Sequence, residues 1–325
     1  MFPSKVRALV IDGVLNPVLW SSGWQVQSDR TASFDVLKQF FQLCDRAGAK
    51  CGLSGPAGSK ARFDQLHDYI RQTPIILDDG QGGISEYRYD TFVADSAGLM
   101  YSPEQWGAYA DFLGLLSNAV QGDAAASRRA LQKRRSMQEA TRNAAPKRAL
   151  YDNNREAYAG NHCSDTEYPS SFSIFSAISR YAKVGSFQGP VFWWTSSTGC
   201  AAWPTAPDRY VGPWTARTSA PVLVVGNFFD PATDYAGAVA SNRLLPNSRL
   251  LSYAGWGHTA AYSGRSACIN DLVSLYLLDG SLPPKGTVCP ASANPFVTAA
   301  ANARMRKSTV MPMTGLPTLK PLPKR

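Results

Sequence analysis

Residues 220–234 read Ala-Pro-Val-Leu-Val-Val-Gly-Asn-Phe-Phe-Asp-Pro-Ala-Thr-Asp, and residues 248–258 read Ser-Arg-Leu-Leu-Ser-Tyr-Ala-Gly-Trp-Gly-His. Val222 to Val225 form an unbroken run of β-branched and aliphatic residues. Such a run is typical of a parallel strand that helices cover on both faces. We predict that this strand ends at Gly226 and that an acid, Asp230, follows it.

A helix and a second strand come next. Apolar residues recur at helical spacing between Asp234 and Leu245, and Pro246 marks the stop. The second strand, from Arg249 to Tyr253, leads into a glycine turn that carries His258. An acid and a histidine therefore follow two successive parallel strands, where open α/β sheets place ligand-binding and catalytic groups. Acid before histidine is the order of an α/β-hydrolase triad, whose nucleophile comes earlier still.

Taken singly, the acid and the histidine have simpler interpretations. An acid that follows a strand is often a helix N-cap, and Asp234 is such a candidate. A lone histidine in a turn is weak evidence of catalysis, because a motif match is only a hypothesis. The full order of strand, helix, strand and Gly-x-Gly-His is what favours a catalytic pair of Asp230 and His258.

Three motifs carry a resemblance to a known family. They are Val-Leu-Val-Val-Gly-Asn-Phe-Phe-Asp-Pro-Ala-Thr at 222–233, Gly-Trp-Gly-His-Thr at 255–259, and Tyr-Leu-Leu-Asp-Gly-Ser-Leu-Pro-Pro-Lys-Gly-Thr-Val-Cys at 276–289, which follows Cys268. Together they resemble the carboxyl-terminal region of the tripeptidyl-aminopeptidase-like α/β-hydrolases, secreted serine exopeptidases and esterases of bacteria and fungi. The resemblance implies an α/β fold, consisting of the carboxyl-terminal part of a hydrolase sheet with a large inserted helical cap. It also implies Asp230 as triad acid, His258 as base, release of amino-terminal peptides from a peptide substrate, or cleavage of a small ester, and no cofactor.

The start of the chain bears on the third member of the triad. Val6 to Ile11 reads as a buried strand that Asp12 and Gly13 end, and residues 1–5 resemble the end of a helix. In α/β-hydrolases such a helix follows the Gly-x-Ser-x-Gly elbow of the nucleophile. No Gly-x-Ser-x-Gly occurs in the sequence, and Gly55-Pro56 after Gly52-Leu53-Ser54 would break the helix that an elbow opens. We therefore expect the chain to begin just after its nucleophile, with an unpaired edge on its first strand.

Two functions are compatible with this sequence. In the first, the chain is part of a serine hydrolase, in which Asp230 orients His258 and His258 transfers protons. In the second, it is a non-catalytic remnant or a binding scaffold, arising from a gene fragment or a mis-called start. An esterase of the same fold is a further alternative to a peptidase. An in-frame Gly-x-Ser-x-Gly ahead of Met1 distinguishes the first function from the second.

The six cysteines indicate an oxidising compartment. Spacing alone leaves their pairing open, whereas the resemblance implies neighbour pairing, in the order Cys44 with Cys51, Cys163 with Cys200, and Cys268 with Cys289. No Cys-x-x-Cys occurs and His162 beside Cys163 lacks zinc-finger spacing, so we expect no metal site. We expect a secreted protein, although Lys5, Arg7 and Asp12 interrupt any signal peptide on this chain.

Four regions are expected along the 325 residues. Residues 1–30 hold the first strand and its loop, 31–210 a helical cap, 211–290 the segment with the acid and histidine, and 291–325 a disordered tail. In the cap, Ser33 is a candidate N-cap for a helix from Phe34 to Ala47. Further helices are expected at Ala61–Gln72, from Pro103 through Leu116, at Asp123–Thr141 and at Tyr168–Val184.

The remaining features concern partners. Trp193 and Trp194 lie at the expected junction of cap and sheet, where they either line a substrate pocket or pack the cap onto the sheet. The net charge of +9 comes mostly from the tail, which contains Arg304, Arg306, Lys307, Lys320, Lys324 and Arg325 without any acid. Basic stretches without interleaved aromatic residues are usually solvated, so we expect no nucleic-acid partner. No apolar run is long enough to span a membrane.

Overall fold

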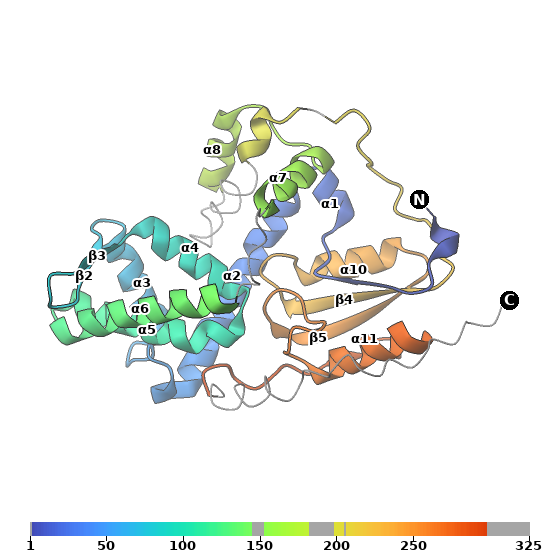
Figure 1. Ribbon diagram of the computed structural model, residues 1–325. Coiled ribbons are helices and arrows are strands. Elements are labelled where there is room, and N and C mark those ends of the chain that lie inside the picture. Colours follow the sequence, from blue (N-terminus) through green and yellow to red (C-terminus); the bar gives the residue numbers. More distant parts are fainter. Residues whose placement is uncertain (1, 145–152, 182–197, 205, 298–325) are drawn as a thin grey trace.

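A computed structural model describes residues 2–144, 153–181, 198–204 and 206–297. Two parts are visible in Figure 1, a parallel sheet flanked by helices and a helical region beside it. This arrangement confirms the predicted α/β class. Trp193, Trp194 and most of the tail lie outside the described residues.

The main sheet has four parallel strands in the order β1-β4-β5-β6. They are β1 (Leu9–Asp12), β4 (Val222–Phe229), β5 (Ser248–Trp256) and β6 (Val288–Cys289). The prediction that the strand after Val222 ends at Gly226 is wrong, because pairing with β5 continues through Gly226 and Asn227 and resumes at Phe229 after an irregularity. The first strand begins at Leu9 and not at Val6, because its pairing with β4 starts where Leu9 lies beside Val222. It is also not the buried strand that we predicted, since it lies at the edge of the sheet and Leu9 is exposed.

Helices cover both faces of this sheet. Val222 and Val224 pack with Ala238 of α10 (Tyr235–Leu244). The alternate residues of β4, Leu223 and Val225, pack in a second cluster with α11 (Ala267–Asp279). Figure 1 shows α10 and α11 on opposite sides of β4 and β5. The unbroken apolar run of β4 therefore has the physical cause that the sequence suggested, burial on both faces.

The six cysteines form three neighbouring pairs. Cys268 at the start of α11 joins Cys289 in β6, Cys44 joins Cys51, and Cys163 joins Cys200. This is the pairing that the resemblance implied and that spacing alone left open. The Cys268–Cys289 bridge holds the two-residue strand β6 at the edge of the sheet.

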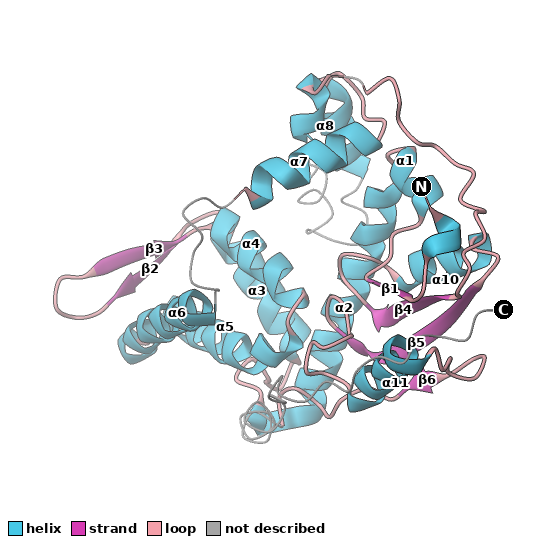
Figure 2. Ribbon diagram, turned by 45° about the vertical axis from the view of Figure 1, so that its right-hand side comes forward, coloured by secondary structure: helices cyan, strands magenta, loops and turns pink. Residues whose placement is uncertain are grey.

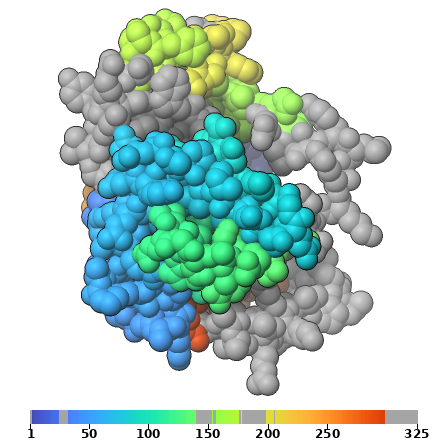
Figure 3. All heavy atoms as spheres, turned by 90° about the vertical axis from the view of Figure 1, so that its left-hand side faces the viewer, coloured from blue at the N-terminus to red at the C-terminus, as the bar shows by residue number. Residues whose placement is uncertain are grey.

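The helical region precedes β4 in the chain. It contains α2 (Gln25–Ala47), α3 (Ser59–Ile70), α4 (Tyr89–Met100), α5 (Trp106–Val120), α6 (Ala124–Ala144), α7 (Asn154–Asp165) and α8 (Phe172–Tyr181), after the short α1 (Pro17–Ser21). Phe40 of α2, Phe63 of α3 and Trp106 of α5 belong to one buried aromatic and aliphatic cluster. Figure 3 shows α6, in green, on the outside of this region against the blue and cyan segments that precede it.

Several features of this region differ from the sequence predictions, among them helices α4 and α7, which were not predicted. Helix α2 begins at Gln25, so Ser33 is buried inside the helix and is not its N-cap. The helix consequently runs across the expected boundary between residues 30 and 31. An antiparallel hairpin of β2 (Ile75–Asp78) and β3 (Ile84–Tyr87), which projects in Figure 2, was not predicted. Its turn is held by Asp79, whose carboxylate accepts hydrogen bonds from the amides of Gln81 and Gly83.

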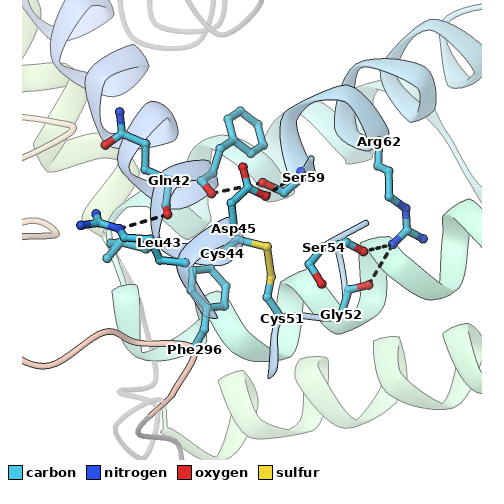
Figure 4. Close-up of a disulfide and its surroundings, with 12 residues drawn as sticks. Gln42, Leu43, Cys44, Asp45, Cys51, Gly52, Ser54, Ser59, Arg62 and Phe296 are labelled. Carbon is cyan, nitrogen blue, oxygen red and sulfur yellow. Dashed lines mark hydrogen bonds between the residues drawn. A yellow bond between two sulfur atoms is a disulfide. The ribbon is translucent and has the colours of Figure 1, made fainter. Parts of the chain in front are cut away.

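Figure 4 shows the Cys44–Cys51 bridge at the end of α2, together with the hydrogen bonds around it. The carboxylate of Asp45 accepts a hydrogen bond from the amide of Ser59 over 2.8 Å. The Arg62 guanidinium donates to the carbonyls of Gly52 and Ser54. Ser54 therefore lies in a structural turn of the helical region, as its failure to match an elbow motif suggested.

Residues 291–297, expected in the disordered tail, pack on the helical region. Phe296 is buried, with its ring centroid 5.2 Å from that of Phe40 and 6.3 Å from that of Trp106. Trp106 also lies 6.2 Å from Trp256 at the end of β5. Aromatic contacts thus join the helical region to the sheet beside the predicted histidine. No helix within the described residues is both long and apolar enough to cross a membrane.

Candidate active site

Asp230 lies directly after β4 and is almost fully buried, with its side chain 1% exposed. One carboxylate oxygen accepts hydrogen bonds from the amides of Ala232 and Thr233, both over 2.9 Å. The N-cap of α10 is a different acid, Asp234, whose carboxylate accepts from the amide of Gly237 over 2.7 Å. The helix-cap interpretation is therefore correct for Asp234, and Asp230 is left to contact another group.

That group is the imidazole of His258. Its Nδ1 lies 3.1 Å from each carboxylate oxygen of Asp230. The same carboxylate accepts the amide of Thr259 over 3.2 Å, and the Thr233 hydroxyl lies 3.4 Å from Nδ1. The contact spans 28 positions of sequence because β4 and β5 are adjacent and end together. The structure thus brings together the two residues that the sequence selected.

The turn around His258 has an unusual main-chain course. Gly257 has φ +95°, and a Cβ placed there would come within 2.6 Å of Pro103 and 2.9 Å of the carbonyl oxygen of Tyr101. Thr259 has φ 59°, which non-glycine residues rarely adopt. The His258 amide donates to the Tyr101 carbonyl over 3.1 Å, and the two rings lie edge to face at 5.4 Å. Glycine at 257 is therefore required by the close approach of the helical region.

Arg265 holds this turn from the other side. Its guanidinium donates to the carbonyls of His258 (2.6 Å) and Thr259 (2.7 Å). It also donates to the Tyr101 carbonyl over 3.0 Å and forms an ion pair with Glu104 over 2.7 Å. One side chain thus joins the turn of the candidate base to the segment between α4 and α5. Nothing in the local pattern around Arg265 pointed to this role.

Asp12 and Gly13, at the end of β1, lie on the third side of the turn. One oxygen of Asp12 accepts from the amides of Ala260 (2.8 Å) and Ala261 (2.7 Å). Gly13 has φ +70°, and a Cβ there would lie 2.9 Å from Cε1 of His258. From the sequence alone, both residues read only as the end of a strand. A signal was present, because Asp12, like Asp230, is an acid at the carboxyl end of a parallel strand.

The surroundings of His258 act on its pKa in opposite directions. Burial is the largest influence and favours the neutral imidazole. The hydrogen bond and the charge of Asp230, together with the charge of Asp12, favour the imidazolium and outweigh burial and the opposing charge of Arg265. The net result is a pKa of His258 above its usual 6.5. Stabilisation of the imidazolium by a neighbouring carboxylate suits a residue that accepts a proton and later returns it.

The other ring nitrogen, Nε2, has no hydrogen-bond partner among the described residues, and the side chain is 33% exposed. No described serine is placed as an elbow. Ser59 and Ser96 are buried within the helical region, and Ser197 lies outside the described residues. Ser266, which follows Gly264 and Arg265, is the N-cap of α11. The described part of the chain therefore contains an acid–base pair with an open nitrogen and no positioned nucleophile.

No group of three or more histidine, cysteine or acidic side chains in the described part of the chain could hold a metal ion.

The parallel sheet, with an acid after β4 and a histidine after β5, is an α/β arrangement similar to the carboxyl-terminal part of an α/β-hydrolase sheet. Residues 186–289 match the model of an α/β-hydrolase family described as TAP-like protein. This match confirms the resemblance that the motifs between Val222 and Cys289 indicated.

The individual relatives that the chain matches include esterases and peptidases. It is 26% identical over 298 residues to carboxylesterase B of Mycobacterium tuberculosis, covering 89% of this chain and 53% of that protein. It is 26% identical over 305 residues to serine protease Hip1 of the same organism, covering 89% and 54%. It is 24% identical over 298 residues to tripeptidyl aminopeptidase of Streptomyces coelicolor, covering 91% and 52%. The chain spans about half the length of the curated relatives it matches.

Proposed function

We propose that Asp230 and His258 are the acid and the general base of a serine hydrolase, acting on a nucleophile that a segment outside these 325 residues carries. One observation carries the proposal: Asp230 holds Nδ1 of His258 over 3.1 Å, while Nε2 is left without a partner among the described residues. This is the arrangement that a serine hydroxyl requires on its base. The absence of Gly-x-Ser-x-Gly from the sequence supports a nucleophile from elsewhere.

The reaction follows from the geometry of the pair. Asp230 keeps a proton on Nδ1, so that neutral His258 presents a lone pair on Nε2. Nε2 takes the hydroxyl proton as the serine attacks a carbonyl carbon, and then gives that proton to the departing amine or alcohol. In the second half, Nε2 takes a proton from the water that attacks the acyl carbon, and returns that proton to the serine oxygen as the bond between this oxygen and the acyl group breaks. Asp230 stabilises the imidazolium formed in both halves, and three main-chain amides hold its carboxylate in place.

We assign a peptide as the substrate class, with release of amino-terminal peptides, and a small ester as the alternative. Relatives named as a tripeptidyl aminopeptidase and a serine protease support the first, and a relative named as a carboxylesterase supports the second. Three disulfides support action in an oxidising, extracellular compartment.

A fluorophosphonate probe, which labels an activated serine, tests the assignment in two polypeptides. The first is the 325-residue chain, which we expect to remain unlabelled. The second is the same chain extended through the in-frame coding sequence ahead of Met1 to a Gly-x-Ser-x-Gly, which we expect to be labelled once per molecule. In the extended polypeptide, His258→Ala should lower the hydrolysis rate by about a millionfold, and Asp230→Asn by about ten-thousandfold.

His67→Ala is the matched control, because this histidine lies on α3 in the helical region and should not affect labelling. Labelling of a serine within the 325 residues would overturn the assignment of the nucleophile. Absence of any in-frame elbow would favour the non-catalytic alternative. Hydrolysis of tripeptide amides and of short acyl esters by the extended polypeptide separates the two substrate classes.

A further inference from the structure

We propose that Asp12 is a positioning residue for His258, which orders the main chain after the histidine and places a second negative charge beside the imidazole. The proposal rests on the proposed function, since it concerns the base of that reaction. Asp12 ends β1, and Asp230 follows the adjacent parallel strand β4, so that both acids project from the same end of the sheet. The His258 turn lies against both of them.

The carboxylates of Asp230 and Asp12 accept hydrogen bonds from three consecutive amides of this turn. Asp230 accepts the amide of Thr259 over 3.2 Å. Asp12 accepts those of Ala260 and Ala261 over 2.8 and 2.7 Å, across 248 and 249 positions of sequence. Because Thr259 has φ 59°, this turn needs support from outside itself. Asp12 supplies that support from the end of β1, and Gly13, which follows β1, leaves room for Cε1 of His258.

Hydrogen bonding alone does not require a charge at this position. An asparagine oxygen would accept both amides without the cost of burying a carboxylate. Burial raises the pKa of Asp12, the bonds from Ala260 and Ala261 oppose this, and the nearby charge of Asp230 raises it further. The second oxygen of Asp12 is shielded from solvent and has no hydrogen-bond partner among the described residues. Burying the Asp12 carboxylate therefore costs free energy. Its attraction for the imidazolium of His258 is a function that an asparagine could not supply.

Several elements pack against His258, and most of them contribute a charged group. Asp230 follows β4, Asp12 ends β1, and both raise the pKa of His258. Arg265, in the loop before α11, lowers it and is itself paired with Glu104. The helical region contributes the ring of Tyr101. Removing the charge of Asp12 therefore shifts this balance toward the neutral imidazole.

The sequence contains only three histidines, which makes the test direct. The full chain is labelled with ¹³C-histidine and titrated by NMR, and the His258→Ala variant identifies the signal of His258. Asp12→Asn keeps a side-chain oxygen for both amides but removes the charge. We expect the titration midpoint of His258 to move to lower pH in this variant, while His67 and His162 keep theirs. Asp271→Asn, the same change at an exposed site on α11, should move none of the three.

Amide hydrogen exchange separates support of the turn from the effect of charge. Exchange at Ala260 and Ala261 should stay slow in Asp12→Asn and become fast in Asp12→Ala. A folded Asp12→Asn variant whose His258 midpoint equals that of the wild type would overturn the proposal. If Asp12→Asn does not fold, the proposal is tested on the wild-type chain. Its His258 signal should then show a second inflection at the pH where Asp12 titrates. A titration curve with a single step would overturn the proposal.

None of these measurements needs hydrolysis, so the two proposals can fail separately. Probe labelling of the extended polypeptide without a midpoint shift in Asp12→Asn would remove only the role of Asp12. A midpoint shift without labelling would support the action of Asp12 on His258 and remove only the proposed reaction.

Discussion

The guanidinium of Arg265 donates a hydrogen bond to the main-chain carbonyl of His258 over 2.6 Å. The same side chain binds the carbonyl of Tyr101 and the carboxylate of Glu104, which belong to the segment between α4 and α5. The position of the candidate base is therefore coupled to the helical region through one largely buried cation, whose side chain is 10% exposed.

Arg265→Met should destabilise the chain and loosen the His258 turn. The variant removes the charged donor of three carbonyls, and a single hydrogen bond to a charged group contributes about 1.5–3 kcal/mol. Glu104→Gln keeps the carbonyl bonds and should cost about 1 kcal/mol. Urea unfolding gives both values, and faster exchange of the His258 amide reports the loosened turn.

Arg88→Met is the control for this pair. Arg88 and Asp90 are both exposed and 3.7 Å apart, so their loss should change stability by about 0.5 kcal/mol or less. An effect of Arg265→Met no larger than that of Arg88→Met would contradict the coupling.

The raised pKa of His258 predicts opposite pH dependences for stability and for hydrolysis. A group whose pKa is higher in the folded state contributes stability that is complete below its unfolded value, here 6.5, and that is lost as pH rises through the folded pKa. The base must be neutral to accept a proton, so hydrolysis rises over that same interval. The checks are urea midpoints of the chain against His258→Gln, and the kcat/KM profile of the extended polypeptide. Equal pH dependence of stability in both chains would contradict the first expectation.

The contribution of each disulfide to the free energy of unfolding should increase with the length of the loop that it closes. Removing Cys268–Cys289, with a separation of 21, by double alanine substitution should cost about 3.4 kcal/mol if strain is small. Removing Cys44–Cys51, with a separation of 7, should cost about 2.5 kcal/mol. Thermal unfolding measures both variants, and peptide mapping without reduction should recover the three neighbouring pairs. Free thiols at all six positions would refute the pairing.

A larger residue at Gly226 in β4 should destabilise the chain, because α10 packs directly on this position. A Cβ at this position would lie 2.6 Å from the Cβ of Ala238. Gly226→Ala should therefore cost about 1–3 kcal/mol, and adding Ala238→Gly should restore part of the loss. Gly98→Ala in α4 is the control. A Cβ at Gly98 would have no atom within 4 Å, so this variant should stabilise the helix by about 0.5–1 kcal/mol. Equal effects of the two alanine substitutions would contradict the close packing.

The core of the candidate site could be predicted from the sequence because its signals are local. The apolar run from Val222, the helix that Asp234 caps and the strand before His258 each depend on residues close together in the chain. Once two parallel strands are placed side by side, the residues after their carboxyl ends must meet, which brings Asp230 to His258. Periodicity likewise located α3 and α5 to within a few residues.

Other features depended on contacts that leave no local pattern. The start of α2 at Gln25 was missed because Ser33 resembles an N-cap, although packing buries it inside a longer helix. The hairpin of β2 and β3 was missed because its strands are only four residues each, and the Asp79 side chain holds its turn.

By itself, the sequence determined the α/β class, the candidate acid and base, and, through its resemblance to a family, the pairing of the cysteines. Only the tertiary structure decided what surrounds the base: Asp12 from β1, Arg265 from the loop before α11, and the Tyr101 carbonyl from the helical region. The physical reason is distance along the chain. A strand or helix arises from neighbouring residues, whereas the bond from the Ala260 amide to Asp12 joins residues 248 positions apart and exists only because β1 packs beside β4.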